Sequence, residues 1–389
     1  MINGNATSGQ GAGGPAAAAA EPPLDNYAKS SGHSATNRLD RWEARDFLWT
    51  YSALARCRKC GRVAVTGDGS VGVRKEGEKV GYAGLATCGS VWSCPVCNAK
   101  VQSRRRLEVD LAIAAAFVLG FGVAFITRTV RHHSGQSLTT VLDTLTRGRA
   151  AIPDHREVKA LRKELGYLGQ IRALEPILDG PNGPHPHDHC LYFFDRPISA
   201  HDLARLHAAE MRAFARRIQS LGGSVPTMEG QDARLVAFGE DALADYFTKS
   251  TYGASKVGFE MTALQTKRGR GGLTPWEVLR LARCGDADAL ETFTGYEKTL
   301  KGKRALTFTR GLRDRLGLGT DQTDEQIAEE TVGSVEDEGF RLASVPWGKG
   351  TGWAGAALLN ALQTGGWSAA RDFCRQNGIE ILEVANEDS

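Results

Sequence analysis

The chain has 389 residues, of which 41% are hydrophobic and 24% are charged, and its formal net charge is +3. This length allows two or three domains, and the composition is ordinary for a soluble protein. No apolar run is long enough to span a bilayer, and residues 1–20 lack the basic and then apolar order of a secretory signal. We therefore expect a cytoplasmic protein without membrane contact.

The charges are unevenly placed along the chain. Residues 321–339 contain acidic residues and neither Lys nor Arg, whereas basic residues gather in four short clusters, at 100–106, 212–217, 267–270 and 298–304. This separation favours a polyanion-binding body with an acidic C-terminal segment. Solvated helix faces are the alternative, which explains one cluster better than all four.

The first part of the chain changes composition near residue 38. Residues 1–38 are rich in Gly, Ala, Ser and Asn and cannot bury enough apolar surface to offset the entropy of ordering, so we expect a disordered tail. A loosely helical spacing of apolar and aromatic residues follows in 40–55. The Gly-rich stretch 62–84 is typical of a hairpin.

Two Cys-x-x-Cys pairs lie on either side of this hairpin. In a cytoplasmic chain, two such pairs indicate a tetrahedral zinc site, because two turns each present two thiolates. We expect a structural zinc ion bound by Cys57, Cys60, Cys94 and Cys97. Cys88 is a fifth cysteine, and the pattern does not decide whether it replaces one of the four. The alternative, a redox dithiol, needs one Cys-x-x-Cys beside a βα unit.

Helices and strands then follow one another without an internal repeat. The expected helices are 99–119, 138–149, 155–165, 198–221, 240–250, 275–284, 286–300 and 352–378. The expected strands are 121–130, 170–178, 186–194, 235–239, the start of 305–312, and 379–384. This pattern predicts an α+β fold, in which helices pack on an antiparallel sheet.

The most informative stretch is Pro-His-Pro-His-Asp-His at 184–189, which continues into apolar residues up to Phe194. It contains three of the nine histidines of the chain. Because alternate side chains of a strand share a face, His187 and His189 can reach one metal ion. A surface histidine tract without a metal is the alternative.

Two imidazoles do not complete a metal site, and no histidine follows His207. Glu175 lies on the strand that the turn at 179–183 joins to the histidine strand, so we expect its carboxylate to be the third ligand. An exposed strand glutamate is the alternative. Two histidines and a carboxylate with open positions suit Mg²⁺ or Mn²⁺ acting as a Lewis acid on a phosphate.

The expected helix 240–250 carries Tyr246 and Lys249 on one face. A phenol that attacks a phosphodiester forms a phosphotyrosine ester, and a neighbouring ammonium favours the phenolate and the charged phosphate. Alone, this pair is a weak signal, since most such pairs lie on helix surfaces.

Three ordered segments resemble the three motifs of HUH endonucleases, and most of all those of rolling-circle replication initiators of plasmids from high-GC Gram-positive bacteria. These segments are 125–133, 185–191 and 246–249, and the cysteine knuckle 88–97 and the segment 302–312 are also similar to parts of these initiators. The resemblance implies a palm-like antiparallel sheet with the first two motifs on adjacent central strands.

The resemblance also implies roles for single residues. His187 and His189 would be the metal ligands, Glu175 would match a carboxylate of several members, and Tyr246 would be the nucleophile. The enzyme would nick one DNA strand at the plasmid origin, stay linked to the 5′ phosphate, leave a 3′ hydroxyl as primer and later rejoin the strand. DNA would be its main partner, with host helicase and DNA polymerase as further partners.

Some positions depart from the family pattern. Arg128 and Asp188 are charged where the family usually has apolar residues. The third motif holds one tyrosine, so strand closure would use either Tyr252 or a water molecule activated by an acid. The candidate acids are Glu240, Asp241 and Asp245.

On this interpretation the chain has five parts. They are a disordered tail (1–38), a zinc-binding domain (39–106), the nuclease domain (107–262), its basic extension (263–318), and an acidic linker with a small helical region (319–389). A relaxase, a transposase of the same superfamily, a barrel hydrolase with a His-x-His strand and a zinc-containing DNA-binding protein without nuclease activity are the alternatives.

Overall fold

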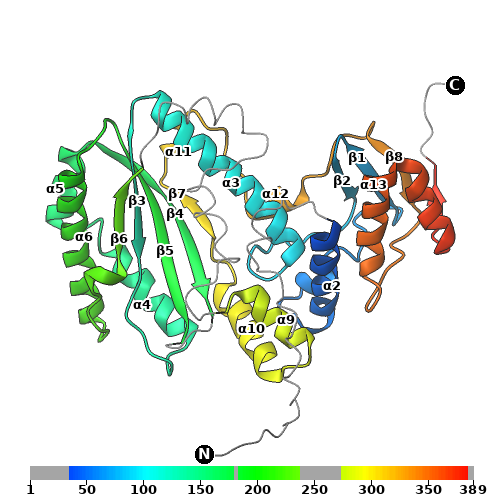
Figure 1. Ribbon diagram of the computed structural model, residues 1–389, viewed down its shortest axis with the longest axis horizontal. Coiled ribbons are helices and arrows are strands. Elements are labelled where there is room, and N and C mark those ends of the chain that lie inside the picture. Colours follow the sequence, from blue (N-terminus) through cyan, green and yellow to red (C-terminus); the bar gives the residue numbers. More distant parts are fainter. Residues whose placement is uncertain (1–34, 179–182, 237–272, 384–389) are drawn as a thin grey trace, which may run out of the picture.

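The computed structural model describes residues 35–178, 183–236 and 273–383, and Figure 1 shows its helices and strands. A five-stranded antiparallel sheet lies at its centre, in the order β6-β3-β5-β4-β7. Its strands are β3 (Gly122–Arg128), β4 (Tyr167–Ile177), β5 (His185–Phe194), β6 (Asp232–Leu235) and β7 (Leu306–Phe308). The strands that carry the first and second motif segments, β3 and β5, are therefore direct neighbours.

Helices cover both faces of this sheet, because alternate residues of β5 are apolar on both sides. Leu191 and Phe193 pack with α3 (Pro95–Val118) on one face. Tyr192 and Phe194 pack on the other face, which is covered by α4 (Leu138–Ala150), α5 (Arg156–Glu164) and α6 (Ala200–Ser220). Figure 1 shows α3 and α6 on opposite sides of the sheet.

Serine residues fix the start of two of these helices. The side chain of Ser137 accepts a hydrogen bond from the backbone of Thr140 at the start of α4, and that of Ser199 accepts one from Asp202 at the start of α6. Each hydroxyl satisfies an N–H that has no partner within the helix. The caps explain why both helices begin directly after a loop.

A second sheet joins segments from both ends of the described chain, in the order β2-β1-β8-β9. Its strands are β1 (Val71–Glu76), β2 (Lys79–Ala83), β8 (Glu338–Leu342) and β9 (Ile381–Leu382). The helices α2 (Ala35–Tyr51) and α13 (Trp353–Gln376) share a buried core with this sheet. The expected hairpin thus pairs with a C-terminal strand, and the division of the chain into domains stays a prediction.

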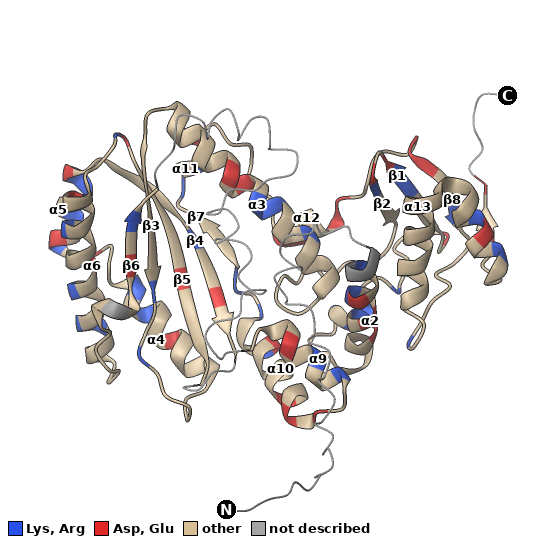
Figure 2. Cartoon of the chain, in the orientation of Figure 1, with Lys and Arg blue, Asp and Glu red and all other residues tan. Residues whose placement is uncertain are grey.

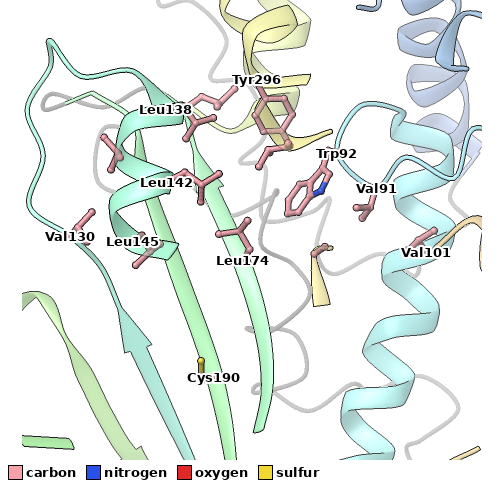
Figure 3. Packing of buried hydrophobic residues seen from close by; sticks show 14 of the residues in the cluster. Val91, Trp92, Val101, Val130, Leu138, Leu142, Leu145, Leu174, Cys190 and Tyr296 are labelled. Carbon is pink, nitrogen blue, oxygen red and sulfur yellow. The ribbon is translucent and has the colours of Figure 1, made fainter. Parts of the chain in front are cut away.

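Further helices complete the described fold. They are α9 (Pro275–Arg283), α10 (Ala287–Leu300), α11 (Leu312–Arg315) and α12 (Asp324–Glu329), with the short turns η1 (Cys57–Lys59) and η2 (Met228–Gly230). Figure 1 shows α9, α10 and α12 between the two sheets. We call residues 56–60 and 88–97 the cysteine segment. One core runs from this segment to the central sheet, and Figure 3 shows Trp92 and Tyr296 facing Leu142 and Leu174 within it. This core packs the cysteine segment against the sheet.

The predicted α+β class is confirmed, with antiparallel sheets, an N-terminal cysteine cluster and a helical C-terminal part. The strand expected at 235–239 begins earlier, as β6, because its pairing with β3 runs from Asp232 to Leu235. Within the acidic segment, α12 is helical and packs on α3. Among the described residues, no helix is both long and apolar enough to cross a membrane.

Candidate metal centre on strands β4 and β5

The pairing of β4 with β5 brings the three predicted ligands together. Glu175 stands opposite His187, and His189 follows two residues later on the same face. Oε2 of Glu175 lies 3.2 Å from Nδ1 of His187 and 2.8 Å from Nε2 of His189. The ligand atoms all lie within 4.8 Å of one another, so they are close enough to hold a single metal ion.

The site is largely buried and carries a charged carboxylate. The side chains of Glu175, His187 and His189 are 6%, 18% and 12% exposed. Burial raises the pKa of Glu175, but hydrogen bonds from the two imidazoles outweigh it and lower this pKa to about 2. The carboxylate is therefore ionised at neutral pH, as a metal ligand must be.

Thr127 contacts the far side of the His189 ring. It stands opposite His189 in the register of β3 and β5, and its Oγ1 lies 3.0 Å from Nδ1 of that ring. When Nε2 of His189 faces a cation, Nδ1 carries the proton and donates to Oγ1 of Thr127. The threonine thereby fixes both the orientation and the tautomer of the imidazole.

His185 lies beside the three predicted ligands, although we assigned it no role from the sequence. Its Nε2 is 3.0 Å from Nε2 of His187 and 2.7 Å from Oγ1 of Thr129. Burial and the neighbouring imidazoles lower the pKa of His185 to about 3, so this ring is neutral at physiological pH. It contacts the ring nitrogen of His187 that faces away from Glu175. The alternation that His185 shares with His187 was the available signal.

The two charged departures from the family pattern are paired on the opposite face of the sheet. Asp188 is buried and accepts hydrogen bonds from Arg149 and Arg172, each at 3.1 Å. Arg128 is also buried and forms an ion pair with Glu210 of α6. Both charges therefore belong to ionic networks behind the metal centre and do not disturb the arrangement of the histidines.

Four buried cysteine sulfurs form a second potential metal site. Sγ of Cys60 lies 3.8 Å from that of Cys94 and 3.6 Å from that of Cys97, and Cys88 and Cys97 are 3.6 Å apart. A tetrahedral zinc ion with Zn–S bonds of about 2.3 Å separates its sulfurs by about 3.8 Å. The spacing therefore fits a zinc ion, and all four thiols are buried.

This group contains Cys88 in the place that the sequence pattern gave to Cys57. We call the turn that holds the first Cys-x-x-Cys pair, residues 57–61, the first knuckle. The amide of Gly61 donates to the carbonyl of Ala86, and the amide of Ala86 donates to the carbonyl of Val63, so the chain that leaves the hairpin lies against the first knuckle. Cys88 arrives among the sulfurs through this backbone pairing, which the Cys-x-x-Cys spacing does not reveal. Cys57 is also buried but does not belong to this four-sulfur group.

Tryptophans from two distant segments hold the first knuckle. The indole N–H of Trp49 donates to the carbonyl of Cys60, and that of Trp347 donates to the carbonyl of Gly61, both at 2.7 Å. Gly61 has a φ of 67°, and an added Cβ would lie 2.1 Å from Nη1 of Arg45. The positive φ favours glycine at this turn, and the missing Cβ leaves room for the Arg45 guanidinium.

The predicted nucleophile and its neighbours cannot be placed. Tyr246 and Lys249 lie outside the described residues, as do Tyr252 and the three candidate acids between 240 and 245. Their roles stay predictions.

Comparison with known proteins finds relatives in Streptomyces. The chain is 27% identical to "Protein rep" of Streptomyces lividans, in a match that covers 67% of this chain and 70% of that protein. It is 29% identical to "Neomycin resistance protein" of Streptomyces cyanogenus over 28% of this chain, and it spans 30% of that relative. No family model and no solved structure matches the chain. The chain is therefore a distant homologue of a protein named rep.

Proposed function

We propose that this protein initiates rolling-circle replication of a plasmid by nicking one DNA strand at the origin. The observation that carries the proposal is the convergence of Glu175, His187 and His189 on adjacent strands. The distant homology to a protein named rep supports it. The protein would act on DNA in the cytoplasm, together with host helicase and DNA polymerase.

The chemistry that we propose is a phosphoryl transfer to a tyrosine. Glu175, His187 and His189 would hold a Mg²⁺ or Mn²⁺ ion, which would supply Lewis-acid polarisation of the scissile phosphate. The phenolic oxygen of Tyr246 attacks the phosphorus, the bond from phosphorus to the 3′ oxygen breaks, and the proton of the phenol ends on that oxygen. The products are a 5′-phosphotyrosine ester and a 3′ hydroxyl that primes synthesis. Lys249 would favour the phenolate and stabilise the phosphate charge.

We propose a structural role for the cysteine group. A zinc ion there would hold the first knuckle, the chain that leaves the hairpin and the start of α3 together. Structural zinc sites of this type contribute directly to the stability of the fold. We assign the cysteine group no part in the proposed reaction, because none of its residues belongs to the candidate metal centre.

The test is the formation of a covalent protein–DNA adduct. The full-length protein would be incubated with Mn²⁺ and a labelled single strand that carries the cognate plasmid origin, and the products separated on a denaturing gel. The wild-type protein should give a denaturant-resistant adduct and Tyr246→Phe should give none. Tyr51→Phe, which removes an exposed phenol on α2, is the matched control and should retain the adduct.

Two results would contradict parts of the proposal. An adduct formed by Tyr246→Phe would show that another residue is the nucleophile. A wild-type protein that binds the origin strand but never forms an adduct would favour the zinc-containing DNA-binding protein without nuclease activity. A relaxase or a transposase would share the adduct chemistry but would prefer a transfer origin or a transposon end to the replication origin.

A further inference from the structure

A basic loop leads away from the candidate metal centre. The amide of Leu174, the residue before Glu175, donates to the carbonyl of Ala305 at 2.9 Å, where β7 pairs with β4. The loop just before Ala305 is exposed and contains Lys301, Lys303 and Arg304. These cations therefore begin at the edge of β4, next to the residue that carries the predicted carboxylate ligand.

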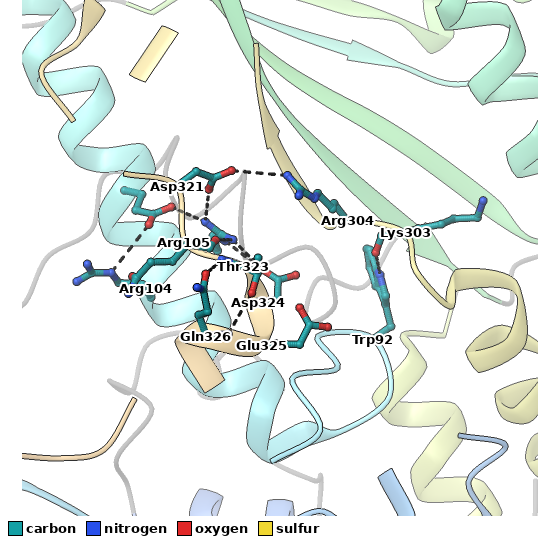
Figure 4. A network of polar contacts seen from close by, with 12 residues as sticks. Trp92, Arg104, Arg105, Lys303, Arg304, Asp321, Thr323, Asp324, Glu325 and Gln326 are labelled. Carbon is teal, nitrogen blue, oxygen red and sulfur yellow. Dashed lines mark hydrogen bonds and ion pairs between the residues drawn. The ribbon is translucent and has the colours of Figure 1, made fainter. Parts of the chain in front are cut away.

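The same loop lines a cavity of about 520 Å³. The cysteine segment, with Arg56 and Arg58, and the start of α12 line the rest of it. The indole N–H of Trp92 donates to the carbonyl of Lys303 at 2.6 Å and ties the loop to the cysteine segment (Figure 4). We call the exposed cations Arg56, Lys301, Lys303 and Arg304 the basic rim.

Acidic side chains lie on the basic rim. Asp321 pairs with Arg304 at 3.6 Å, and Glu325 pairs with Arg56 at 2.8 Å. Figure 4 shows Asp321 facing Arg304, and Figure 2 shows charges of both signs along α3 next to α12. The four side chains are between 42% and 64% exposed, and ion pairs this exposed contribute little to stability and are screened by salt.

Asp321 precedes α12 and also pairs with the largely buried Arg105 at 3.3 Å and with Arg313 at 3.8 Å, so a DNA phosphate would compete with it at Arg304 only. The inner side of α12 is held more firmly than Glu325. Arg105 is buried and donates to Oδ1 of Asp324 at 2.9 Å, and Ile327 is fully buried. A capping box fixes the first turn of the helix. An added Cβ at Gly89 would lie 2.7 Å from Cα of Glu325, so the helix is seated closely on the cysteine segment. A competing anion would therefore displace side chains and leave the helix in place.

We propose that the basic rim binds the sugar-phosphate backbone of the single-stranded DNA that flanks the candidate metal centre, and that Asp321 and Glu325 occupy this surface until the strand displaces them. The proposal rests on the proposed function, because it assumes a DNA strand at Glu175. It adds the path of that strand, and it identifies two carboxylates of the protein that compete with the DNA phosphates for the same cations.

Charge and shape favour a single strand over other partners. The basic rim presents cations from two segments at the mouth of a cavity, which suits a flexible backbone that passes from one cation to the next. Among the described residues that line this cavity, Trp92 is the aromatic one, and it is buried and cannot stack on a base. The surface should therefore bind phosphates without reading sequence.

The test is the affinity of the full-length protein for a labelled single strand of random sequence, measured by fluorescence anisotropy at several salt concentrations. Asp321→Asn with Glu325→Gln removes the competing charges, and its affinity should rise about fivefold to tenfold. The control, Glu336→Gln with Asp372→Asn, changes the net charge equally at two acids that pair with Ser334 and Arg375. Its affinity should stay within about twofold of the wild type.

A second variant tests the basic rim itself. Arg56→Gln with Arg304→Gln removes two phosphate contacts, so the slope of log affinity against log salt should become shallower by roughly 1.4, at about 0.7 for each contact. The inference is overturned if the slope is unchanged, or if the two acidic double variants bind equally. Either result can occur while the origin adduct still forms, which keeps the proposed function. If the wild-type protein forms no adduct but the variants change affinity and salt slope as expected, only the proposed function is contradicted.

Discussion

Thr127 is a residue whose role depends on strand pairing. The sequence places it in a strand that resembles a family motif, but its contact with Nδ1 of His189 follows from the β3–β5 register. The convergence of the three predicted ligands was itself predictable, because His187 and His189 alternate along one strand and Glu175 precedes the turn. Contacts across strands require a register, and a single strand's sequence does not supply one.

Replacing Thr127 by Val should weaken metal binding without removing a ligand. The isosteric side chain keeps the packing but no longer accepts a hydrogen bond from Nδ1 of His189, so Mn²⁺ affinity should fall about 10-fold to 100-fold. Isothermal titration calorimetry at neutral pH measures this. Thr144→Val, on α4 behind the sheet, should bind Mn²⁺ like the wild type. Equal affinities of the two variants would contradict the role of Thr127.

Zinc binding should depend on Cys88 and not on Cys57. Cys88→Ser should lose the bound zinc, whereas Cys57→Ser should retain about one zinc ion per chain, because the four-sulfur group excludes Cys57. Metal analysis of the purified variants measures the difference. The opposite result, with zinc lost only from Cys57→Ser, would restore the ligand set that the spacing alone suggested.

Among the elements, α6 and β3 are joined by a buried ionic network that the sequence did not predict. Glu210 pairs with Arg128 of β3 and with Arg162 of α5, and Tyr192 donates to it at 2.9 Å. The apolar periodicity of 198–221 correctly predicted the helix, since it records burial. It gave no indication that a carboxylate would be buried, because the partners lie on other elements.

Glu210→Gln should destabilise the protein by about 3–5 kcal/mol, because it leaves Arg128 buried without its counter-charge. Urea unfolding measures the loss. Glu164→Gln breaks an exposed pair with Arg205 and should cost less than about 1 kcal/mol. Similar losses in the two variants would mean that the buried network contributes no more than a surface ion pair.

The effect of Glu210→Gln should also depend on pH. Burial raises the pKa of Glu210, but Arg128 and Arg162 outweigh it and lower this pKa below its usual value of 4.5. A carboxyl group with a lowered pKa in the folded state stabilises that state above the unfolded pKa, and this contribution is lost as pH falls through the folded pKa. The stability difference between wild type and variant should therefore be full at pH 7 and shrink below about pH 4.5. A difference that stays constant down to pH 3 would contradict this assignment.

At the scale of the whole molecule, the two sheets have separate cores. The second core contains Trp42, Trp49 and Phe340 and does not include the strands that carry the candidate metal centre. The sequence predicted the hairpin but not that it pairs with β8 of the C-terminal part. Their pairing joins residues far apart in sequence, and local periodicity contains no information on such partners.

Phe340→Ala should therefore destabilise the second sheet and leave metal binding at the central sheet unchanged. Phe340 is fully buried, so its loss should destabilise the second sheet by about 3–5 kcal/mol. Hydrogen exchange should quicken at Val73 and Leu342 in this sheet, whereas Mn²⁺ affinity should stay within about twofold of the wild type. A parallel loss of Mn²⁺ binding would show that the two cores unfold together.

The bond between Arg74 and Glu338 spans 264 residues of chain. At about 5–20 residues per second, the ribosome needs roughly 13–53 s to make the intervening polypeptide. A two-stranded hairpin is marginal on its own, so β1 and β2 must wait through this interval with an unpaired edge. During translation β1 thus depends on a segment made much later to protect its edge, and a stalled ribosome would leave that edge open to aggregation.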